Sequence, residues 1–387
     1  MIIIDLMRKL IIHAGTPKTG TTSIQASLYA NQKILNEKNY IYFKKKISKK
    51  PFSVQINFNY WINKKNYFKQ SKKFIESINN LKTEKKIIIS SEMFWEKSEE
   101  EIEFFIKNLD KDLKQNISIL IYLRRQDLQI YSSYVENLKR IYDNEIDDIP
   151  IFDSIKLQQK QKYLNDPLSM TPEILDYLSK VKFLCKIVGF ENIHIRIFEK
   201  NKLKNCDAID DFFDYLNIKG NFKKISTNHS LSSYQCQLLI QMINKSINEK
   251  FNISELTRRF ILRFFPKKIN SGRKNFVDKK TIKNFYLSNY YESNEIINNE
   301  FLMKSRTTLF SDNFNNYPDT FIKNNFKPPK FISLINKKNI VYLNVIARTY
   351  FFCLKSFYYS LYFLAKIFRT KNLEHFFLKK IILTDQF

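Results

Sequence analysis

The sequence is poor in the residues that build metal clusters and disulfide scaffolds. Among 387 residues there are only four cysteines and four histidines. They are scattered and form no CxxC pair, so the sequence gives a zinc cluster no support. Isolated cysteines are typical of free thiols in a reducing cytoplasm, which is the compartment we expect. The cysteines are Cys185, Cys206, Cys236 and Cys353.

The sequence has no long uninterrupted apolar run. Residues 1–10 are apolar over only a few positions and have no small-residue cleavage site, so we expect a strand there rather than a signal peptide. The segment 340–368 is rich in large apolar and aromatic residues. Its longest uncharged run, 356–365, is half of the ~20 residues that a membrane span requires. Two interpretations stay open for 340–368: a helix resting on the anionic inner face of a membrane, or an ordinary core helix.

Acidic residues are fewer than basic residues in this sequence. The sequence has 65 Lys and Arg against 38 Asp and Glu, a formal net charge of +27, and residues 313–387 alone carry 12 against 3, a net of +9. Such an excess favours anionic partners, although a base composition biased towards A and T would produce it too. The aromatic residues are not spaced as an RNA-binding sheet would need, so we expect no nucleic-acid partner.

Short apolar strands alternate with helical patterns along the chain, which is typical of a parallel sheet covered by helices. We therefore predict an α/β domain over 1–312 and a basic, aromatic, helical extension over 313–387. The segment 144–170 predicts a lid or an acceptor-binding insertion. The predicted strands are 10–14, 86–91, 116–123 and 193–197; the predicted helices are 23–29, 99–109, 128–139 and one with Thr171 as N-cap and Pro172 at its first position, ended by Gly189.

A loop with the composition of an anion site follows the first predicted strand. It reads Gly15-Thr16-Pro17-Lys18-Thr19-Gly20-Thr21-Thr22. Its glycines allow a close backbone approach, and the helix N-terminus that follows favours negative charge. Gly15 and Gly20 have the spacing of the nucleotide-triphosphate pattern GxxxxGK[ST], but Thr21 replaces the lysine of that pattern and a lysine stands at Lys18 instead. The loop therefore favours a phosphate ligand other than magnesium-bound ATP.

The stretch from His13 to Gln25 resembles the 5′-phosphosulfate-binding loop of bacterial sulfotransferases. The resemblance implies a P-loop-NTPase-like three-layer sandwich with a central parallel sheet. It also implies that the donor is 3′-phosphoadenosine-5′-phosphosulfate (PAPS) and that Lys18 contacts the phosphosulfate bridge. The 5′-phosphate would be held by Gly20, Thr21 and Thr22.

A second motif of this family is an arginine at the end of a later strand and a serine eight residues on, which bind the 3′-phosphate. Arg124 and Ser132 match both residue types and the spacing. Arg125 and Ser133 have the same spacing, so the register is open by one residue. We favour Arg124 because it directly follows the apolar strand. The segment 271–274 is a weaker match to a basic donor-binding loop.

The family places a histidine or a glutamate at the end of a strand between the two donor motifs, where it acts as the base. Glu92 has that place, and we predict it as the base, with Lys18 as the cation at the bridging oxygen. The alternative is that Glu92 caps the following helix, and His13 is expected to support the loop. No acidic cluster suited to magnesium stands beside either motif, so we expect a metal-free transfer.

Together these features predict a PAPS-dependent sulfotransferase that makes an in-line transfer to an acceptor hydroxyl, with an amine as the less favoured acceptor. A glycan or glycolipid is the acceptor class by analogy with the bacterial family. Its partners would be PAPS, the product adenosine 3′,5′-bisphosphate (PAP) and the acceptor. Two alternatives stay open. One is a P-loop kinase that uses ATP and magnesium, and the other is a basic nucleic-acid- or membrane-binding protein with an inactive loop.

Overall fold

The computed structural model divides the chain into two compact units. The first consists of Met1–Gln129, Glu173–Asn228 and Leu287–Asp312, and the second of Ile130–Pro172, His229–Tyr286 and Asn313–Phe387. The structure describes residues 8–43, 67–140, 168, 173–226, 231–248, 253, 257, 260–261, 277–302, 308–311, 313–319 and 339–367.

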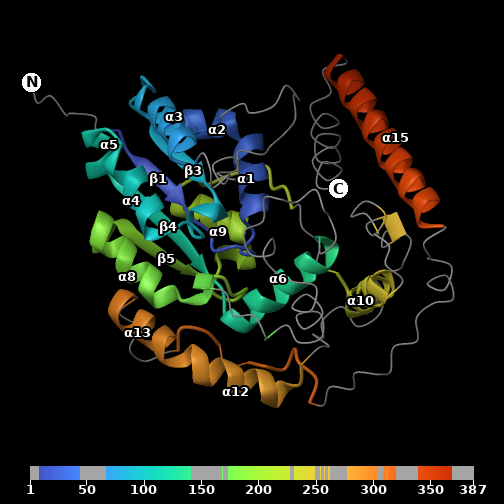
Figure 1. The fold of residues 1–387 in the computed structure, drawn as a ribbon. Coiled ribbons are helices and arrows are strands. Elements are labelled where there is room, and N and C mark those ends of the chain that lie inside the picture. Colours follow the sequence, from blue (N-terminus) through green and yellow to red (C-terminus); the bar gives the residue numbers. More distant parts are fainter. Residues whose placement is uncertain are drawn as a thin grey trace, which may run out of the picture. The chain divides into compact units, whose positions relative to one another are not determined.

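The first unit is built on a five-stranded sheet in the order β2-β3-β1-β4-β5 (Figure 1). Every pair of neighbouring strands is parallel, which confirms the predicted α/β sheet. All residues of β1 and β4 are buried, as expected for strands that are covered on both faces. The strands are β1 Leu10–His13, β2 Tyr40–Tyr42, β3 Lys86–Ser90, β4 Ile117–Leu123 and β5 Ile193–Ile197.

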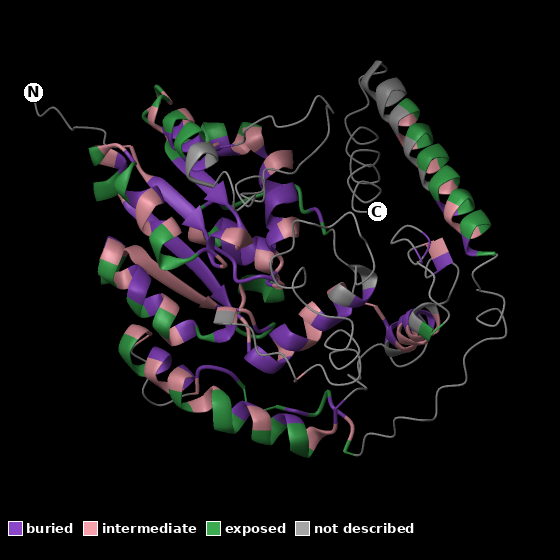
Figure 2. Ribbon diagram, viewed as in Figure 1, coloured by how far each residue is buried: buried purple, intermediate pink, exposed green. Residues whose placement is uncertain are grey.

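Helices cover both faces of this sheet (Figure 2). On one face α1, α2 and α9 pack with the strands around Ile11, Ile88 and Leu120. On the other face α3 contacts α4, and α8 contacts α4, β4 and β5. The bounds are α1 Thr21–Ala30, α2 Gln32–Glu37, α3 Tyr67–Asn79, α4 Glu99–Lys107, α5 Lys111–Gln115, α8 Tyr177–Val188, α9 Ala208–Tyr215 and α13 Tyr291–Phe301.

The start of α8 differs from the prediction. A 3₁₀ turn covers Glu173–Leu175, and α8 begins at Tyr177 with Asp176 as its N-cap, whose side chain accepts a hydrogen bond from the Ser179 amide. The carbonyl of Ile174 is used instead by a tertiary contact, because the Trp95 indole donates to it at 2.9 Å. The predicted helix start at Pro172 is therefore wrong, although the end at Gly189 is confirmed. Thr171 and Pro172 themselves lie outside the described residues.

We predicted no helix or strand within residues 31–85, yet the structure has α2, β2 and α3 there. Strand β2 is only three residues long, which is too short for an alternation to be read. In α3 the buried side chains are Phe74, Ile75 and Ile78. The predicted lid or insertion, apart from Leu168, and the weak motif at 271–274 lie outside the described residues.

The regular elements described in the second unit are helices. Its core gathers Tyr134 and Leu138 of α6, Leu239 and Met242 of α10, and Ile340 of α15. This core therefore combines residues from both sides of position 312, where we predicted a domain boundary. The division into domains 1–312 and 313–387 stays a prediction. The bounds are α6 Gln126–Arg140, whose first turn belongs to the first unit, α10 Ser233–Asn248, α12 Lys279–Asn289 and α15 Ile340–Ile367.

Candidate functional site

Three predicted site segments follow three adjacent strands. The loop Gly15–Thr22 follows β1, Glu92 follows β3 and Arg124 follows β4, and β1 lies between the other two. Because the strands are parallel, these segments share the carboxyl edge of the sheet. Helix α1 packs on one face of the sheet and α4 on the other, so neighbouring strands send their chains to opposite faces. Such a switch point is where open α/β sheets bind ligands.

Glycines and one strained lysine shape the loop after β1. Gly15 and Gly20 have φ values of 93° and 82°, and Lys18 has a φ of 66°. A left-handed conformation in a non-glycine residue costs on the order of 1 kcal/mol or more, so the surrounding contacts must hold Lys18 there. The loop is tied to β4, because the amide and hydroxyl of Thr16 both donate to the Tyr122 carbonyl at 2.9 and 3.0 Å.

The start of α1 leaves hydrogen-bond donors for a ligand. Its N-cap is Gly20, and no side chain caps the helix. Of the first-turn amides, that of Ser23 donates to the Gly20 carbonyl at 2.9 Å. The hydroxyl of Thr21 is buried and has no hydrogen-bond partner among the described residues. A buried hydroxyl without a partner is costly in a finished structure. The loop therefore fits a phosphate group at this helix end.

The two adjacent arginines after β4 have different surroundings. Arg124 is half-buried, donates to the Lys18 carbonyl at 2.8 Å, and places its guanidinium 5.6 Å from the centre of the Phe198 ring. Arg125 is buried and forms two hydrogen bonds to Asp127, at 2.6 and 3.0 Å, and one to the Ser311 carbonyl. Arg124 thus lies against the phosphate loop, while Arg125 joins distant parts of the first unit. Both candidate serines are on α6 beyond Gln129, in the second unit.

Glu92 lies beside the beginning of the phosphate loop. It opens a 3₁₀ turn at the end of β3, and a Cβ atom added to Gly15 would be only 3.0 Å from the Glu92 Cα. The next helix, α4, is capped by Ser98 and Glu101, which form a complete capping box. The alternative role of Glu92 as the cap of that helix is therefore wrong.

The structure adds a second carboxyl group that the sequence analysis missed. Burial, and then the negative charge of Glu92, raise the pKa of Glu96 to about 7, against the opposing effects of Lys97 and Lys18. Glu92, Glu96 and Lys18 are thus close enough to influence one another. The sequence feature that could have pointed to Glu96 is its spacing of four residues from Glu92. The turn that brings the two glutamates together was not predicted.

Glu96 gives a pH-dependent stability that can be measured. Since its folded pKa is raised above the ordinary 4.5 to about 7, the contribution is fully present below pH 4.5 and is lost as the pH rises through 7. We expect Glu96→Gln to be more stable than the parent at pH 8, by up to ~3 kcal/mol relative to their difference at pH 4.5. Urea unfolding at both pH values measures this. The exposed Glu100→Gln is the control, and an equal pH dependence in the two variants would contradict the prediction.

His13 supports the loop from within the core. It is fully buried, its Nδ1 lies 2.8 Å from the Ser90 hydroxyl, and its ring contacts Tyr122 and Phe212. Burial lowers the pKa of His13 to about 3, so the imidazole is neutral at physiological pH. A hydrogen bond also links the carboxyl end of β3 to α1, because the Gln25 side-chain amide donates to the Ser90 carbonyl at 2.9 Å.

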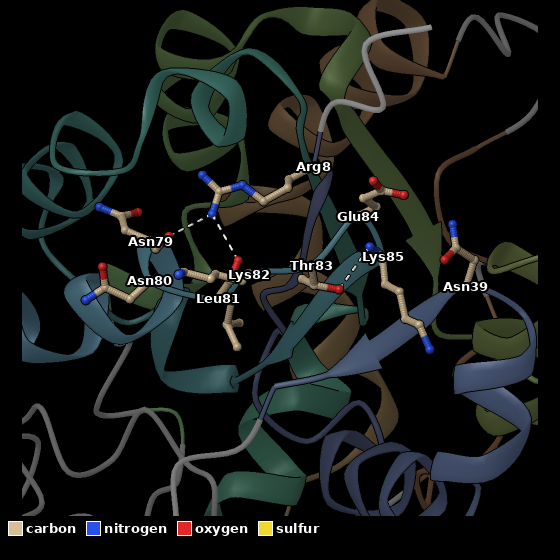
Figure 3. Close-up of a pocket in the computed structure, with 9 residues that line it drawn as sticks. All are labelled: Arg8, Asn39, Asn79, Asn80, Leu81, Lys82, Thr83, Glu84 and Lys85. Carbon is tan, nitrogen blue, oxygen red and sulfur yellow. Dashed lines mark hydrogen bonds between the residues drawn. The ribbon is translucent and has the colours of Figure 1, made fainter. Parts of the chain in front are cut away.

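A cleft of about 930 Å³ lies at the other edge of the sheet (Figure 3). Its lining comes from Arg8 before β1, Asn39 before β2 and the connection 79–85 before β3, so it is at the amino ends of the strands. The Arg8 guanidinium is already bound to Asp110, Asp112 and the Asn79 carbonyl. The cleft is therefore separate from the predicted donor site.

No protein-family model matches the sequence, and no curated protein matches it. Among solved structures, the chain is similar to a sulfotransferase from Alicyclobacillus acidocaldarius, with 10% identity, a TM-score of 0.34, and coverage of 67% of this chain and 97% of that chain. A likeness at this level does not establish a shared activity. The structural neighbour is a bacterial sulfotransferase, and the fold of the present chain is a five-stranded parallel α/β sheet with helices on both faces.

Proposed function

We propose that this protein is a sulfotransferase of the P-loop-like three-layer class that moves a sulfuryl group from PAPS to an acceptor hydroxyl. The observation that carries the proposal is the meeting of a phosphate loop, Arg124 and Glu92 at one sheet edge. A loop alone would suit many anions. The hydrogen bond from Arg124 to the Lys18 carbonyl holds a second cationic side chain beside the loop, as a donor with phosphate at two places would need.

The proposed donor contacts divide between two groups. The backbone amides of the loop Gly15–Thr22, with the hydroxyls of Thr21 and Thr22, bind the 5′-phosphate. The planar guanidinium of Arg124 binds the 3′-phosphate, which an ordinary adenine nucleotide lacks. Ser132 joins Arg124 on the grounds of the family spacing. Arg125 suits this role less well, because its guanidinium is engaged with Asp127 and the Ser311 carbonyl.

In the proposed reaction Glu92 and Lys18 have separate tasks. Bound PAPS supplies an electrophilic sulfur, to which the acceptor oxygen bonds as the bond to the bridging oxygen breaks and its electron pair stays with PAP. Glu92 takes the proton of the acceptor hydroxyl as this bond forms. The Lys18 ammonium group compensates the negative charge that grows on the bridging oxygen. Glu96, with its pKa raised to about 7, is partly protonated near neutral pH, which reduces the negative charge beside Glu92.

The acceptor class rests on the family resemblance alone. We propose a hydroxyl of a glycan or glycolipid, and a cytoplasmic enzyme. The kinase alternative is less well supported because the lysine that follows the second glycine in kinase loops is replaced by Thr21.

Calorimetric titration with PAP, compared with ATP and magnesium, tests the donor site. We expect PAP to bind and ATP with magnesium to bind more weakly. Lys18→Ala and Arg124→Ala should each lower the affinity for PAP about 10- to 100-fold, because each removes a charged contact worth ~1.5–3 kcal/mol. The control is Lys33→Ala on α2, whose side chain is 91% exposed. Preference for ATP with magnesium would instead support the kinase, and no nucleotide binding would support a protein with an inactive loop.

A further inference from the structure

Among the described residues, helix α15 contacts the rest of the second unit along one side. Ile340 belongs to the core of that unit, and Ala347 is also buried. Asn344 accepts a hydrogen bond from the Thr257 hydroxyl, and the Tyr350 ring lies 5.2 Å from the Phe260 ring. These residues recur every three or four positions, so they define a single stripe along the helix.

The other side of α15 is apolar and exposed. Among the described residues, six of the eight large hydrophobic side chains that are exposed belong to this helix. At about 100° per residue, the six fall within an arc of about 160°. A contiguous apolar surface of this kind marks an interaction site rather than ordinary solvent exposure. They are Val341 (61%), Tyr342 (72%), Val345 (59%), Ile346 (50%), Phe352 (71%) and Phe357 (58%).

The charged residues of α15 are all basic and lie at similar angles around the helix axis. The helix has 28 residues and contains Arg348, Lys355 and Lys366 but no Asp or Glu. In the register of an α-helix these three positions fall within about 20° of one another, at the border between the apolar arc and the packed stripe. A line of cations beside an exposed apolar arc is the pattern of a helix that lies in an anionic interface.

We propose that α15 binds an anionic lipid surface, with its apolar arc in the boundary between headgroups and acyl chains and its opposite side still packed on the second unit. By length and composition Ile340–Tyr358 is also apolar enough to cross a membrane. The packed stripe favours the interfacial position, because a spanning helix would have to leave the contacts of Ile340, Asn344 and Tyr350. This inference is independent of the donor site.

Flotation of the full-length protein with vesicles tests it. We expect at least about tenfold stronger binding to vesicles of phosphatidylcholine with 30% phosphatidylglycerol than to pure phosphatidylcholine, and weaker binding at high salt. Val345→Glu with Ile346→Glu should abolish binding, and Arg348→Glu should weaken it about tenfold. All three positions are exposed, so the variants should keep the parental thermal melt. The matched control is Leu287→Glu, an exposed apolar residue on α12.

Three results would overturn the proposal. The first is that the protein fails to float with either vesicle. The second is binding that ignores anionic lipid and resists high salt and alkaline washing, as a spanning helix would. The third is a concentration-dependent dimer in sedimentation that Val345→Glu with Ile346→Glu disrupts, without any vesicle binding, since a second copy would then cover the arc.

Discussion

We expect Glu92→Gln to lower kcat for the proposed sulfuryl transfer at least ~100-fold, within the range for a lost general base, while the affinity for PAP stays at the parental value. The amide keeps the size of the carboxylate but cannot accept the acceptor proton. The Glu92 backbone, which lies against Gly15, is unchanged by the substitution. Release of PAP from PAPS in the presence of a glycan or glycolipid acceptor gives the rate, and calorimetry gives the affinity.

Two further variants make this prediction specific to Glu92. Glu100→Gln, on the exposed surface of α4, should leave kcat unchanged. Glu96→Gln should alter the pH profile of kcat more than its maximum, because the raised pKa of Glu96 places its titration near 7, beside Glu92. If Glu96→Gln showed the large loss and Glu92→Gln the small one, the base would be Glu96.

We expect Asp127→Ala to destabilise the protein by about 3–5 kcal/mol, because it removes one partner of a buried ion pair. The Arg125 and Asp127 side chains are 2% and 0% exposed, and their closest contact is 2.6 Å. Without Asp127, the guanidinium stays buried beside the Ser311 carbonyl but loses its carboxylate. Urea unfolding at pH 7 measures the loss. The exposed surface pair of Lys204 and Asp214 supplies the control, and Asp214→Ala should cost at most ~1 kcal/mol.

The same comparison decides between the two adjacent arginines. We expect Arg125→Ala to lower the free energy of unfolding strongly, and Arg124→Ala to lower PAP affinity with a much smaller effect on stability. If Arg125→Ala instead lost PAP affinity while keeping parental stability, the 3′-phosphate pair would be Arg125 with Ser133. That outcome would shift the motif by one residue and leave the phosphate loop as proposed.

The amino-acid sequence by itself determined the central strands and the phosphate loop. The apolar runs at 10–14, 86–91 and 116–123 lie almost as predicted, because a strand covered on both faces needs an unbroken apolar segment. Gly15 and Gly20 occupy left-handed positions that glycine adopts at little cost. Gly189 ends α8 with a φ of 88°. Each of these features depends on residues that are neighbours in the chain.

The tertiary structure alone decided which of several chemically equal side chains lie at the site. Arg124 and Arg125 differ because one meets the Lys18 carbonyl and the other meets Ser311, 186 residues away. Glu96 was missed because its raised pKa depends on burial and on its nearness to Glu92 and Lys18. The start of α8 moved because Trp95 uses the Ile174 carbonyl. In each case the deciding partner is brought close by the fold, and no local pattern records it.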